Sequence, residues 1–484
     1  MNISILHLSD LHRDVLEEAH NDSLLYSLER DFELFPTSTP QISIPNICVI
    51  SGDLIFGSNK KGNDAYSDIK KQYGQTKNFL IELANRFFDK DRNKIIITPG
   101  NHDVCREIIK DCIEKIKRPR SRKKIKELKK QLNVSSSGIK WSWDDLCFYK
   151  ISNQEKYNQK FSLFADMYEE FYEGARRYSL EPAEQWDIFD FPDLSISVGT
   201  LNSCFNNDQF RLAGEIHPGA LSKLCKEMKA PKRKGWVLAA TWHHNTTRQP
   251  FREDHLPSFF LQTLIESDIG LGMHGHQHSP DCFDEQHRYG PEKRKITIIS
   301  ASTLCAGSHS LRGGIPQSYN VIEIDRRRRQ GRVHQRAMMD GDIKYPIWIP
   351  GKFLQTQTSF VDFDPVIPNE ERPAHLDLLN ALCEAEKALS SKKWRKVIEL
   401  LVHYKDNGDA RLFISTALEN MNDDRKTIEV LSPPTTIPEA IVVGGSIKSL
   451  RDKQLAEEFL KNRLVAESND TSLEYIKRSL ERIV

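Results

Sequence analysis

Five short apolar runs, each followed by residues that can bind a metal ion, constrain the fold of this chain more than any other feature. The runs span residues 3–8, 47–50, 95–98, 236–241 and 269–273. Continuous apolar runs of this length are typical of strands buried on both faces, as in parallel or mixed sheets covered by helices. The sequence therefore predicts an α/β fold.

The segments that end the runs are rich in Asp, His and Asn. They read Ser9-Asp10-Leu11-His12, Ser51-Gly52-Asp53, Asn101-His102-Asp103, Trp242-His243-His244-Asn245 and His274-Gly275-His276-Gln277-His278. In open α/β sheets, ligands bind beyond the carboxyl ends of the strands. Because five strands end in such residues, we expect one shared site.

Helical patterns alternate with these strands at residues 15–33 and 66–88, which supports an α/β core. Further strands are expected at residues 194–201, 296–300, 319–324 and 332–338. These four carry no motif, and a second sheet packed on the first is their expected place. The predicted fold is a two-sheet sandwich flanked by helices.

The chain is expected to divide into a first domain at residues 1–350, a linker at 351–373 and a helical domain at 374–484. The alternation of strand and helix patterns stops at residues 104–190, where we expect a helical insertion or cap beside the site. In the last domain, Val397, Ile428 and Phe459 recur at 31-residue intervals, near the period of helix-hairpin repeats. Degenerate repeats and a plain helical bundle both fit this domain.

Composition excludes several classes of protein. The net charge of +1 gives no hint of a polyanionic partner for the whole molecule. The nine cysteines form no CxxC pair, which argues against a disulfide framework and a thiolate zinc site. The first residues lack the features of a signal peptide, and no run approaches the roughly 18 apolar residues of a membrane span. We therefore expect a cytoplasmic protein.

Asp, His and Asn in this number suit a pair of divalent metal ions. Two ions about 3.5–4 Å apart provide a bound hydroxide and neutralise phosphate charge, which is how phosphate esters are hydrolysed at such sites. The candidate ligands are Asp10, His12, Asp53, Asn101, one of His243 and His244, His276 and His278. A mixed nitrogen and oxygen set suits manganese, which we expect, or iron or zinc.

In their order, the motifs resemble those of the calcineurin-like metallophosphoesterase superfamily, whose pattern runs D-x-H, G-D, G-N-H-D/E, H-x and G-H-x-H. The resemblance covers about the first 340 residues. It implies a metallophosphoesterase sandwich and hydrolysis by attack of a metal-bound hydroxide on phosphorus.

The resemblance also implies a role for each residue. One metal ion would be held by Asp10, His12 and His278, the other by Asn101, His243 and His276, with Asp53 as the bridge between them. His102 would be a non-ligating catalytic histidine that stabilises the phosphate or protonates the leaving group. Asp103 would orient the backbone or His102.

One motif departs from the family pattern. Many relatives have a proline after the fourth-motif histidine, whereas here His244 and Asn245 follow His243. His243 is the expected ligand because the first histidine matches the family position, and His244 is the alternative. His274 is expected near the site without binding metal, and His7 is expected in the core.

The motifs also indicate which branch of the superfamily this chain resembles. Ser/Thr protein phosphatases of the superfamily resemble G-D-x-V-D-R-G, and this chain lacks that arginine and second aspartate after Asp53. The segments that begin at His7 and Pro99 look more like the bacterial cyclic-nucleotide phosphodiesterase and repair-nuclease branches. We therefore expect a phosphodiesterase.

A run of cations favours nucleic acid as the substrate. Residues 115–130 hold ten Lys or Arg and one acid, Glu127. Lys and Arg contacts to phosphates release counterions, although such runs are often solvated helix faces. The candidate contacts are Lys117, Arg118, Arg120, Arg122, Lys123 and Lys124. A cyclic-nucleotide or other small-diester phosphodiesterase is the alternative.

A second alternative is a scaffold that recruits a partner and carries a vestigial phosphoesterase. All the expected ligand positions are filled, which argues against it. An active enzyme whose helical C-terminal domain binds a protein partner is expected instead.

Overall fold

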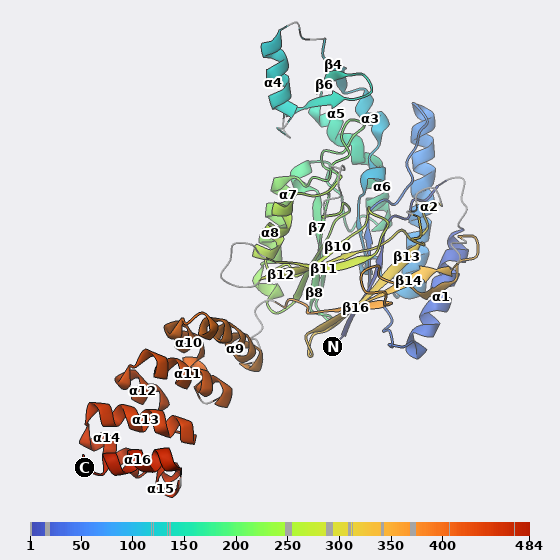
Figure 1. Cartoon of the computed structure of the whole chain (residues 1–484). Coiled ribbons are helices and arrows are strands. Elements are labelled where there is room, and N and C mark those ends of the chain that lie inside the picture. The colour runs from blue at the N-terminus through green and yellow to red at the C-terminus, as the bar shows by residue number, and fades with distance from the viewer. Residues whose placement is uncertain are drawn as a thin grey trace. The chain divides into compact units, whose positions relative to one another are not determined.

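The computed structural model of the chain describes residues 2–484 apart from 15–19, 118, 120, 133, 135, 136, 247–253, 287–293, 308–310, 312, 340–342, 368–373, 406 and 469. The chain forms two compact units, Met1–Asn369 and Glu370–Val484. Figure 1 shows the strands gathered in the first unit and the second unit built from helices.

The first sheet of unit 1 has a parallel part and an antiparallel part. The parallel strands are β1 (Asn2–Leu8), β2 (Ile47–Ser51) and β3 (Ile95–Thr98). The antiparallel strands are β13 (Ser318–Asp325), β14 (Gln330–Met338), β15 (Trp348–Pro350) and β16 (Phe360–Phe363). The sheet runs β15-β14-β13-β1-β2-β3, and β16 also pairs with β14.

The second sheet runs β11-β12-β10-β9-β8-β7. Its strands are β7 (Trp186–Phe191), β8 (Ile196–Leu201), β9 (Val237–Thr241), β10 (Leu271–His274), β11 (Asp281–Gln286) and β12 (Lys295–Ser300). The four central strands β8, β9, β10 and β12 are parallel, and the two edge strands are antiparallel.

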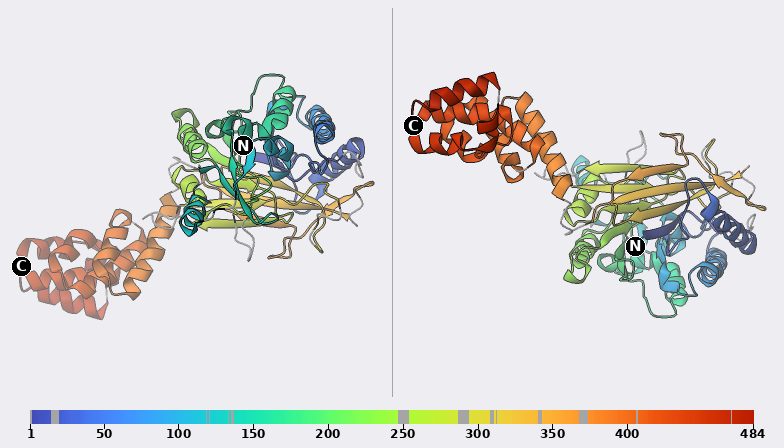
Figure 2. Two further views of the ribbon diagram at one scale, coloured as in Figure 1. Left: turned by 90° about the horizontal axis from the view of Figure 1, so that it is seen from above. Right: turned by 90° about the horizontal axis from the view of Figure 1, so that it is seen from below.

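The two sheets pack on each other and are covered by helices on their outer faces (Figure 2). The first sheet carries α1 (Asn21–Leu34), α2 (Asn63–Phe87) and α6 (Ser162–Phe171). The second carries α7 (Pro218–Met228) and α8 (Ser258–Glu266). The predicted α/β two-sheet sandwich is confirmed.

Burial patterns explain why these segments take these forms. Six of the seven residues of β1 are buried, as expected for a strand covered on both faces. In α2 the buried positions recur every three or four residues, among them Ile69, Tyr73, Leu80 and Leu83. That spacing places one apolar stripe against the sheet and leaves the opposite face to solvent.

Two strands expected in the second sheet belong to the first. The segments at residues 319–324 and 332–338 form β13 and β14, and β13 pairs with β1 on the side away from β2. The chain thus returns to the first sheet after completing the second. Periodicity alone could not show this, because it reveals that a segment is a strand but not which strand it pairs with.

The expectation of a helical insertion at residues 104–190 was wrong in part. The insertion includes the helices α3 (Arg106–Lys110), α4 (Arg122–Leu132) and α5 (Gln154–Asn158). It also contains a three-stranded antiparallel sheet of β4 (Ile113–Lys115), β6 (Cys147–Ile151) and β5 (Ile139–Ser142). These strands are short and carry several lysines, which hid their strand character.

The last third of the expected insertion belongs to the sandwich itself. Phe164, Tyr168 and Phe171 of α6 are buried in the main core, and β7 pairs with β8 in the second sheet. The aromatic-rich segment from residue 161 to 178 is therefore a core element, because these large apolar side chains gain most from burial against the sheet.

The first unit extends beyond the boundary expected at residue 350. Residues 360–363, expected in the linker, form β16, whose residues Val361 and Phe363 pair with Val333 and Gly331 of β14. Residues 368–373 lie outside the described part of the chain.

The second unit is built from helix pairs. Its helices are α9 (Ala374–Ser390), α10 (Trp394–Leu401), α11 (Gly408–Met421), α12 (Asp424–Leu431), α13 (Ile437–Leu450), α14 (Lys453–Leu460), α15 (Arg463–Glu467) and α16 (Thr471–Leu480). A long helix precedes a short one three times, and the short ones begin at residues 394, 424 and 453. Val397, Ile428 and Phe459 each lie on a short helix, which favours the helix-hairpin prediction over a plain bundle.

Local sequence fixes where most of these helices begin. Six of them start after an Asn, Asp or Thr whose side chain accepts a hydrogen bond from a backbone N–H of the first turn: Asn407, Asp423, Thr436, Asp452, Asn462 and Asp470. Such caps satisfy N–H groups that have no partner within the helix. The caps thus set the first residue of each helix from α11 to α16.

A buried ion pair joins α11 to α13. Arg411 and Glu439 are 7% and 3% exposed, and Arg411 Nε and one Nη donate to the two carboxylate oxygens at 2.8 and 3.0 Å. Thr435 also donates to Glu439 through its backbone N–H and its hydroxyl, at 2.7 and 2.9 Å. The carboxylate is thus fully satisfied only while the arginine is present.

We expect Arg411→Ala to lower the free energy of unfolding of the C-terminal unit by about 3–5 kcal/mol, because it leaves the buried carboxylate of Glu439 without its charge partner. Chemical denaturation followed by circular dichroism measures this. Arg463, which is 87% exposed and pairs with Glu467, is the matched control, and its change to Ala should cost at most about 1 kcal/mol. Equal losses of stability in the two variants would contradict a stabilising role for the Arg411 pair.

No helix in the described part of the chain combines the length and apolar character needed to cross a membrane.

Candidate metal centre

The metal-capable side chains meet where the parallel strands of both sheets end. Backbone hydrogen bonds hold the loops together: Asp10 N–H donates to Gly52 and His12 N–H to Asp53, both at 3.0 Å. Between the two sheets, His276 N–H donates to Asp10 Oδ2 at 3.0 Å. Five segments far apart in sequence are therefore brought to one place.

A first group of ligand atoms comes from Asp10, His12 and His278. His278 Nε2 lies 3.1 Å from Asp10 Oδ1 and 3.1 Å from His12 Nε2. Metal–ligand bonds of about 2.1 Å place neighbouring ligand atoms roughly 3.0–3.4 Å apart, so this spacing suits three ligands of one ion.

A second group comes from Asp53, Asn101, His243 and His276. His243 Nε2 lies 3.2 Å from Asp53 Oδ2 and 3.0 Å from Asn101 Oδ1. His276 Nδ1 lies 2.9 Å from Asn101 Oδ1 and 3.3 Å from His243 Nε2. These atoms have the same mutual spacing as the first group.

Asp53 stands between the two groups. Its Oδ2 is 3.2 Å from His243 Nε2 in one group and 3.8 Å from His12 Nε2 in the other. Its Oδ1 accepts the backbone N–H of His102 at 2.8 Å, which fixes the carboxylate plane. Asp53 could therefore contact ions on both sides, and Asp10 forms a further metal-capable group with Asp53 and His243.

Hydrogen bonds distinguish His243 from His244. A carbonyl can only accept, so His243 Nδ1–H donates to Ser51 at 2.9 Å, and in the neutral ring Nε2 keeps its lone pair toward Asp53 and Asn101. His244 has both ring nitrogens engaged, Nδ1 with the Ser203 hydroxyl at 2.9 Å and Nε2 with the Asn207 amide at 3.2 Å. The geometry therefore favours His243 as the ligand.

His244 supports the centre from one side. Its ring centroid is 4.6 Å from that of His276, and its bonds to Ser203 and Asn207 hold the loop that follows β8. It is buried, so a substrate could not reach it without movement of that loop.

We expect His243→Ala to lower the metal content by one ion per chain, whereas His244→Ala should retain all the bound metal. Elemental analysis of both variants after loading with manganese tests this. If His244→Ala lost an ion and His243→Ala did not, the ligand would be His244 and the missing proline would have shifted the motif by one residue.

His102 lies beside the metal-binding groups and faces solvent. Its Nδ1–H donates to the carbonyl of Phe56 at 2.6 Å, and its Nε2 lies 4.0 Å from Asp53 Oδ2. The side chain is 33% exposed, whereas that of His12 is 3% exposed. Among the described residues, His102 forms a metal-capable group with His12 and Asp53. Its open nitrogen could bind either a metal ion or a substrate oxygen.

Asp103 holds the backbone of this motif. Its Oδ2 accepts the N–H of Gly100 at 2.8 Å and of Leu54 at 3.2 Å, and its Oδ1 accepts the Tyr73 hydroxyl at 3.0 Å. Burial, with Asp53 nearby, raises the pKa of Asp103 to about 7. Of the two roles suggested by the resemblance, orienting the backbone is the one with hydrogen bonds.

Several candidate ligands have an unusual backbone conformation. Asp10, His12, Asp53, His276 and His278 have φ between 42° and 68° although none is glycine. Non-glycine residues rarely adopt the left-handed region, and such conformations gather at functional sites where the surroundings enforce them. Five of the seven expected ligands share this feature, which marks these loops as built for the site.

Close approach of backbone to ligand explains two glycines. A Cβ at Gly100 would collide with the carboxylate and backbone of Asp53, and one at Gly275 would collide with Ser9 and Asp10. Any side chain at either position would push a ligand out of place.

The carboxylates of the site are held in their charged form. Burial alone would raise their pKa values, but neighbouring imidazoles, His278 for Asp10 and His243 for Asp53, hold both pKa values below the usual range. Burial lowers the pKa of His243, yet the Asp53 carboxylate overcomes this and raises it to about 9. Two buried anions surrounded by imidazoles form a site that attracts cations.

Some residues of the site were missed in the sequence. Asp254 Oδ2 lies 3.4 Å from His276 Nε2, so that ring donates to a carboxylate while Nδ1 faces the centre. The Ser9 hydroxyl donates to Asp10 Oδ2 at 2.5 Å. Such partners orient ligands and raise their basicity. Ser9 stood inside a motif, but nothing in the sequence linked Asp254 to His276.

The other singled-out residues lie as follows. His7 is buried in β1 with Nε2 3.0 Å from the Ser51 hydroxyl, and His274 is buried with Nδ1–H donating to Gly275 at 3.0 Å. Lys117 and the cations of α4 are exposed within the insertion. Arg118 and Arg120 lie outside the described residues.

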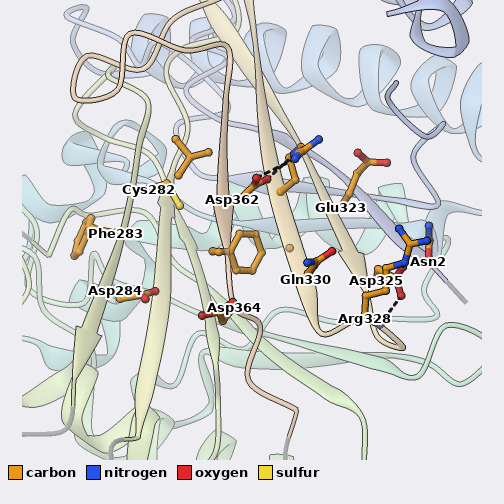
Figure 3. A pocket seen from close by; sticks show the side chains of 14 residues that line it. Asn2, Cys282, Phe283, Asp284, Glu323, Asp325, Arg328, Gln330, Asp362 and Asp364 are labelled. Carbon is orange, nitrogen blue, oxygen red and sulfur yellow. Dashed lines mark hydrogen bonds and ion pairs between the residues drawn. The ribbon is translucent and has the colours of Figure 1, made fainter. Parts of the chain in front are cut away.

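A pocket of about 690 Å³ lies elsewhere, between β11, β13, β14 and β16 (Figure 3). Asn2, at the start of β1, lines it, whereas the metal centre follows the end of that strand. Several of its acidic side chains are paired within the protein, for example Asp284 with Lys295 at 2.8 Å and Glu323 with His334 at 2.8 Å. The pocket is distinct from the metal centre.

Comparison with solved structures returned distant likenesses. One is GAP50, the anchor in the inner membrane complex of Plasmodium, with 9% identity, a TM-score of 0.33, and coverage of 76% of this chain and 90% of that chain. Two others are Vps29 from Entamoeba histolytica and from Chaetomium thermophilum. Their identities are 8% and 9%, and their TM-scores are 0.26 and 0.25. Each match covers 75% of this chain, and the matches cover 100% and 97% of the two Vps29 chains. At these scores the likenesses carry no argument, and no curated protein matches the chain.

The sequence model of the calcineurin-like phosphoesterase family matches residues 3–280, more than half of the chain. The match spans all five motifs, and their side chains form the buried His/Asp centre described above. This chain therefore belongs to the calcineurin-like phosphoesterase family and is a metallophosphoesterase.

Proposed function

We propose that this metallophosphoesterase is a phosphodiesterase that binds two divalent metal ions, with manganese as the expected metal, and cleaves nucleic acid. The observation that carries the proposal is the position of the insertion. It begins directly after the Asn101–Asp103 motif and projects from the edge of the sandwich where β1, β2 and β3 end (Figure 1). The metal centre and the cationic α4 are thus on the same side of unit 1.

The donor atoms support a pair of ions. Asp10, His12 and His278 would hold one, Asn101, His243 and His276 the other, and Asp53 would contact both. When bound, such ions activate water and neutralise the charge of the phosphate. Imidazole nitrogens with carboxylate and amide oxygens suit manganese, iron or zinc.

The chain itself would supply the remaining chemistry. His102 points Nε2 toward the centre, and its Nδ1–H is held by Phe56. With a proton on Nε2, the imidazolium would bind a phosphate oxygen and then donate that proton to the leaving oxygen. Asp103 would keep the loop of His102 in position through Gly100 and Leu54.

A cyclic-nucleotide or other small-diester phosphodiesterase is the competing function. It needs the metal centre but has no use for a cationic insertion. The six exposed Lys and Arg of α4 therefore favour the longer substrate.

A substrate panel tests the proposal. The purified chain, loaded with manganese, zinc or iron in separate samples, is assayed on single- and double-stranded DNA, RNA, cyclic nucleotides, a phosphomonoester and bis-p-nitrophenyl phosphate. We expect hydrolysis of the diesters, nucleic acid above all, and little of the monoester. Turnover confined to cyclic nucleotides would replace the nuclease proposal with the competing function.

The C-terminal unit stays a predicted partner-binding module, and the cytoplasmic location stays a prediction.

A further inference from the structure

Positive charge is concentrated in the insertion that follows the third motif. Residues 111–153 hold twelve Lys or Arg and five Asp or Glu, a net charge of +7, although the whole chain carries +1. The rest of the chain is therefore acidic on balance. Cations gathered on one small region are the electrostatic footprint of a surface that binds a polyanion.

Half of these cations lie on α4 and point to solvent. Leu128 is buried and Ile125 half-buried, and they mark the side on which α4 packs against β5. The exposed cations of the helix are Arg122, Lys123, Lys124, Lys126, Lys129 and Lys130. Within the described part of the chain, these six make no ion pair with an acid. Their charge is therefore available to phosphates and is not used to hold the helix.

The neighbouring hairpin exposes an indole ring. Trp143 lies in the turn between β5 and β6 and is 77% exposed. Its ring is 5.8 Å from that of Trp141, which itself packs against Phe148 at 4.8 Å, so the hairpin holds Trp143 without covering it. The exposed indole thus offers an aromatic face on which an unpaired base can stack.

The hairpin is tied to the metal centre by a series of side-chain interactions. Tyr149 of β6 stacks on Phe210 at 4.9 Å, and Lys140 of β5 binds Asp208 at 2.9 Å. In the same loop, Asn207 donates to His244, whose ring packs on the candidate ligand His276. A strand held by the hairpin would therefore be held in register with the centre.

We infer that α4 and the β5–β6 hairpin bind a single-stranded segment of nucleic acid, with phosphates on the cations of α4 and a base stacked on Trp143. This rests on the proposed function and names its substrate class. In a duplex the base faces are covered by their neighbours, whereas an unpaired base offers a free face to an indole. Stacking and phosphate binding tolerate any sequence, so the surface would bind single strands of mixed sequence.

Binding of a fluorescein-labelled single-stranded oligonucleotide of mixed sequence tests the inference. The full-length chain carrying Asp53→Asn is used so that the strand is not cut during the measurement. Trp143→Ala should weaken binding roughly 5- to 100-fold, the usual worth of one base stack, and Trp143→Phe should recover part of it. The matched control is Tyr345→Ala, since Tyr345 is 78% exposed elsewhere in unit 1. Its change should leave binding unaltered.

The cations are tested by salt dependence. Lys123, Lys124, Lys129 and Lys130 changed together to Gln should weaken binding of the single strand. The log–log salt slope should fall by about 0.7 for each phosphate that the variant no longer neutralises. The control removes the same charge from Lys392, Lys393, Arg395 and Lys396, which are exposed in unit 2. That control should keep the parent's affinity and slope.

The outcomes separate this inference from the proposed function. If nucleic acid is cut but the Trp143 and α4 variants bind the single strand as the parent does, the inferred binding surface is wrong and the proposed nuclease function is supported. If the variants lose binding as expected but the parent cuts no nucleic acid, the proposed nuclease function is wrong and the single-strand binding surface is supported. Tighter binding of duplex than of single strand would overturn the inference. So would loss of binding to anionic phospholipid vesicles in the variants with oligonucleotide binding unchanged.

Discussion

Asp53→Asn is expected to lower phosphodiester turnover by more than the about 10²–10⁴-fold that loss of a positioned acid costs. Asp53 Oδ2 lies between His243 Nε2 and His12 Nε2, so it is placed to serve both groups of ligands. An amide has the same shape but is neutral and offers one oxygen. The variant should therefore fold, keep the hydrogen bond from the His102 N–H to Oδ1, and lose bound metal.

Two measurements check this result, kcat/KM on bis-p-nitrophenyl phosphate and the metal content per chain. Asp364→Asn is the control, since Asp364 is exposed in unit 1 and is not one of the metal-capable residues. Full turnover in Asp53→Asn would mean that Asp53 does not join the two groups.

His102→Ala is expected to cut turnover about 10²–10⁴-fold while leaving the metal content intact. The ring is half-buried, is fixed by Phe56 through Nδ1, and presents Nε2 beside the centre, as a proton donor to the substrate would. Loss of a proton donor matters most for a poor leaving group. The defect should therefore be larger on a nucleotide diester than on a nitrophenyl diester, whose leaving group departs without a proton.

The metal content of the variant gives an independent readout. Loss of metal from the variant would show instead that His102 is a ligand, as its place in a group with His12 and Asp53 would allow.

The parallel half of each sheet could be predicted because its strands are apolar on both faces. β1, β2, β3, β9 and β10 lie within two residues of the expected runs. The match of residues 3–280 to the family confirms the superfamily that the motif order indicated. Strand partners depend on packing between distant segments, which is why β13 and β14 were expected in the wrong sheet. The hairpin of the insertion was not predicted for another reason: its strands are short and polar.

The candidate ligands could be named from the motifs, but their ligating atoms could not. Which nitrogen of His243 faces the centre depends on the Ser51 carbonyl, a backbone group that carries no sequence signal. The same holds for His244, whose nitrogens are engaged by Ser203 and Asn207. The positive φ of Asp10 and Asp53 is equally hidden, because only a small fraction of residues of any type other than glycine adopt it.

The decisive measurement for the bridged metal centre is the number of metal ions bound per chain. Protein purified without chelator, loaded with manganese and freed of excess metal, is analysed for all transition metals together with its concentration. We expect two ions per chain in the parent and one in His243→Ala. A value near zero in the parent after loading would contradict a metal centre at Asp53, and a value near one would contradict the bridged pair.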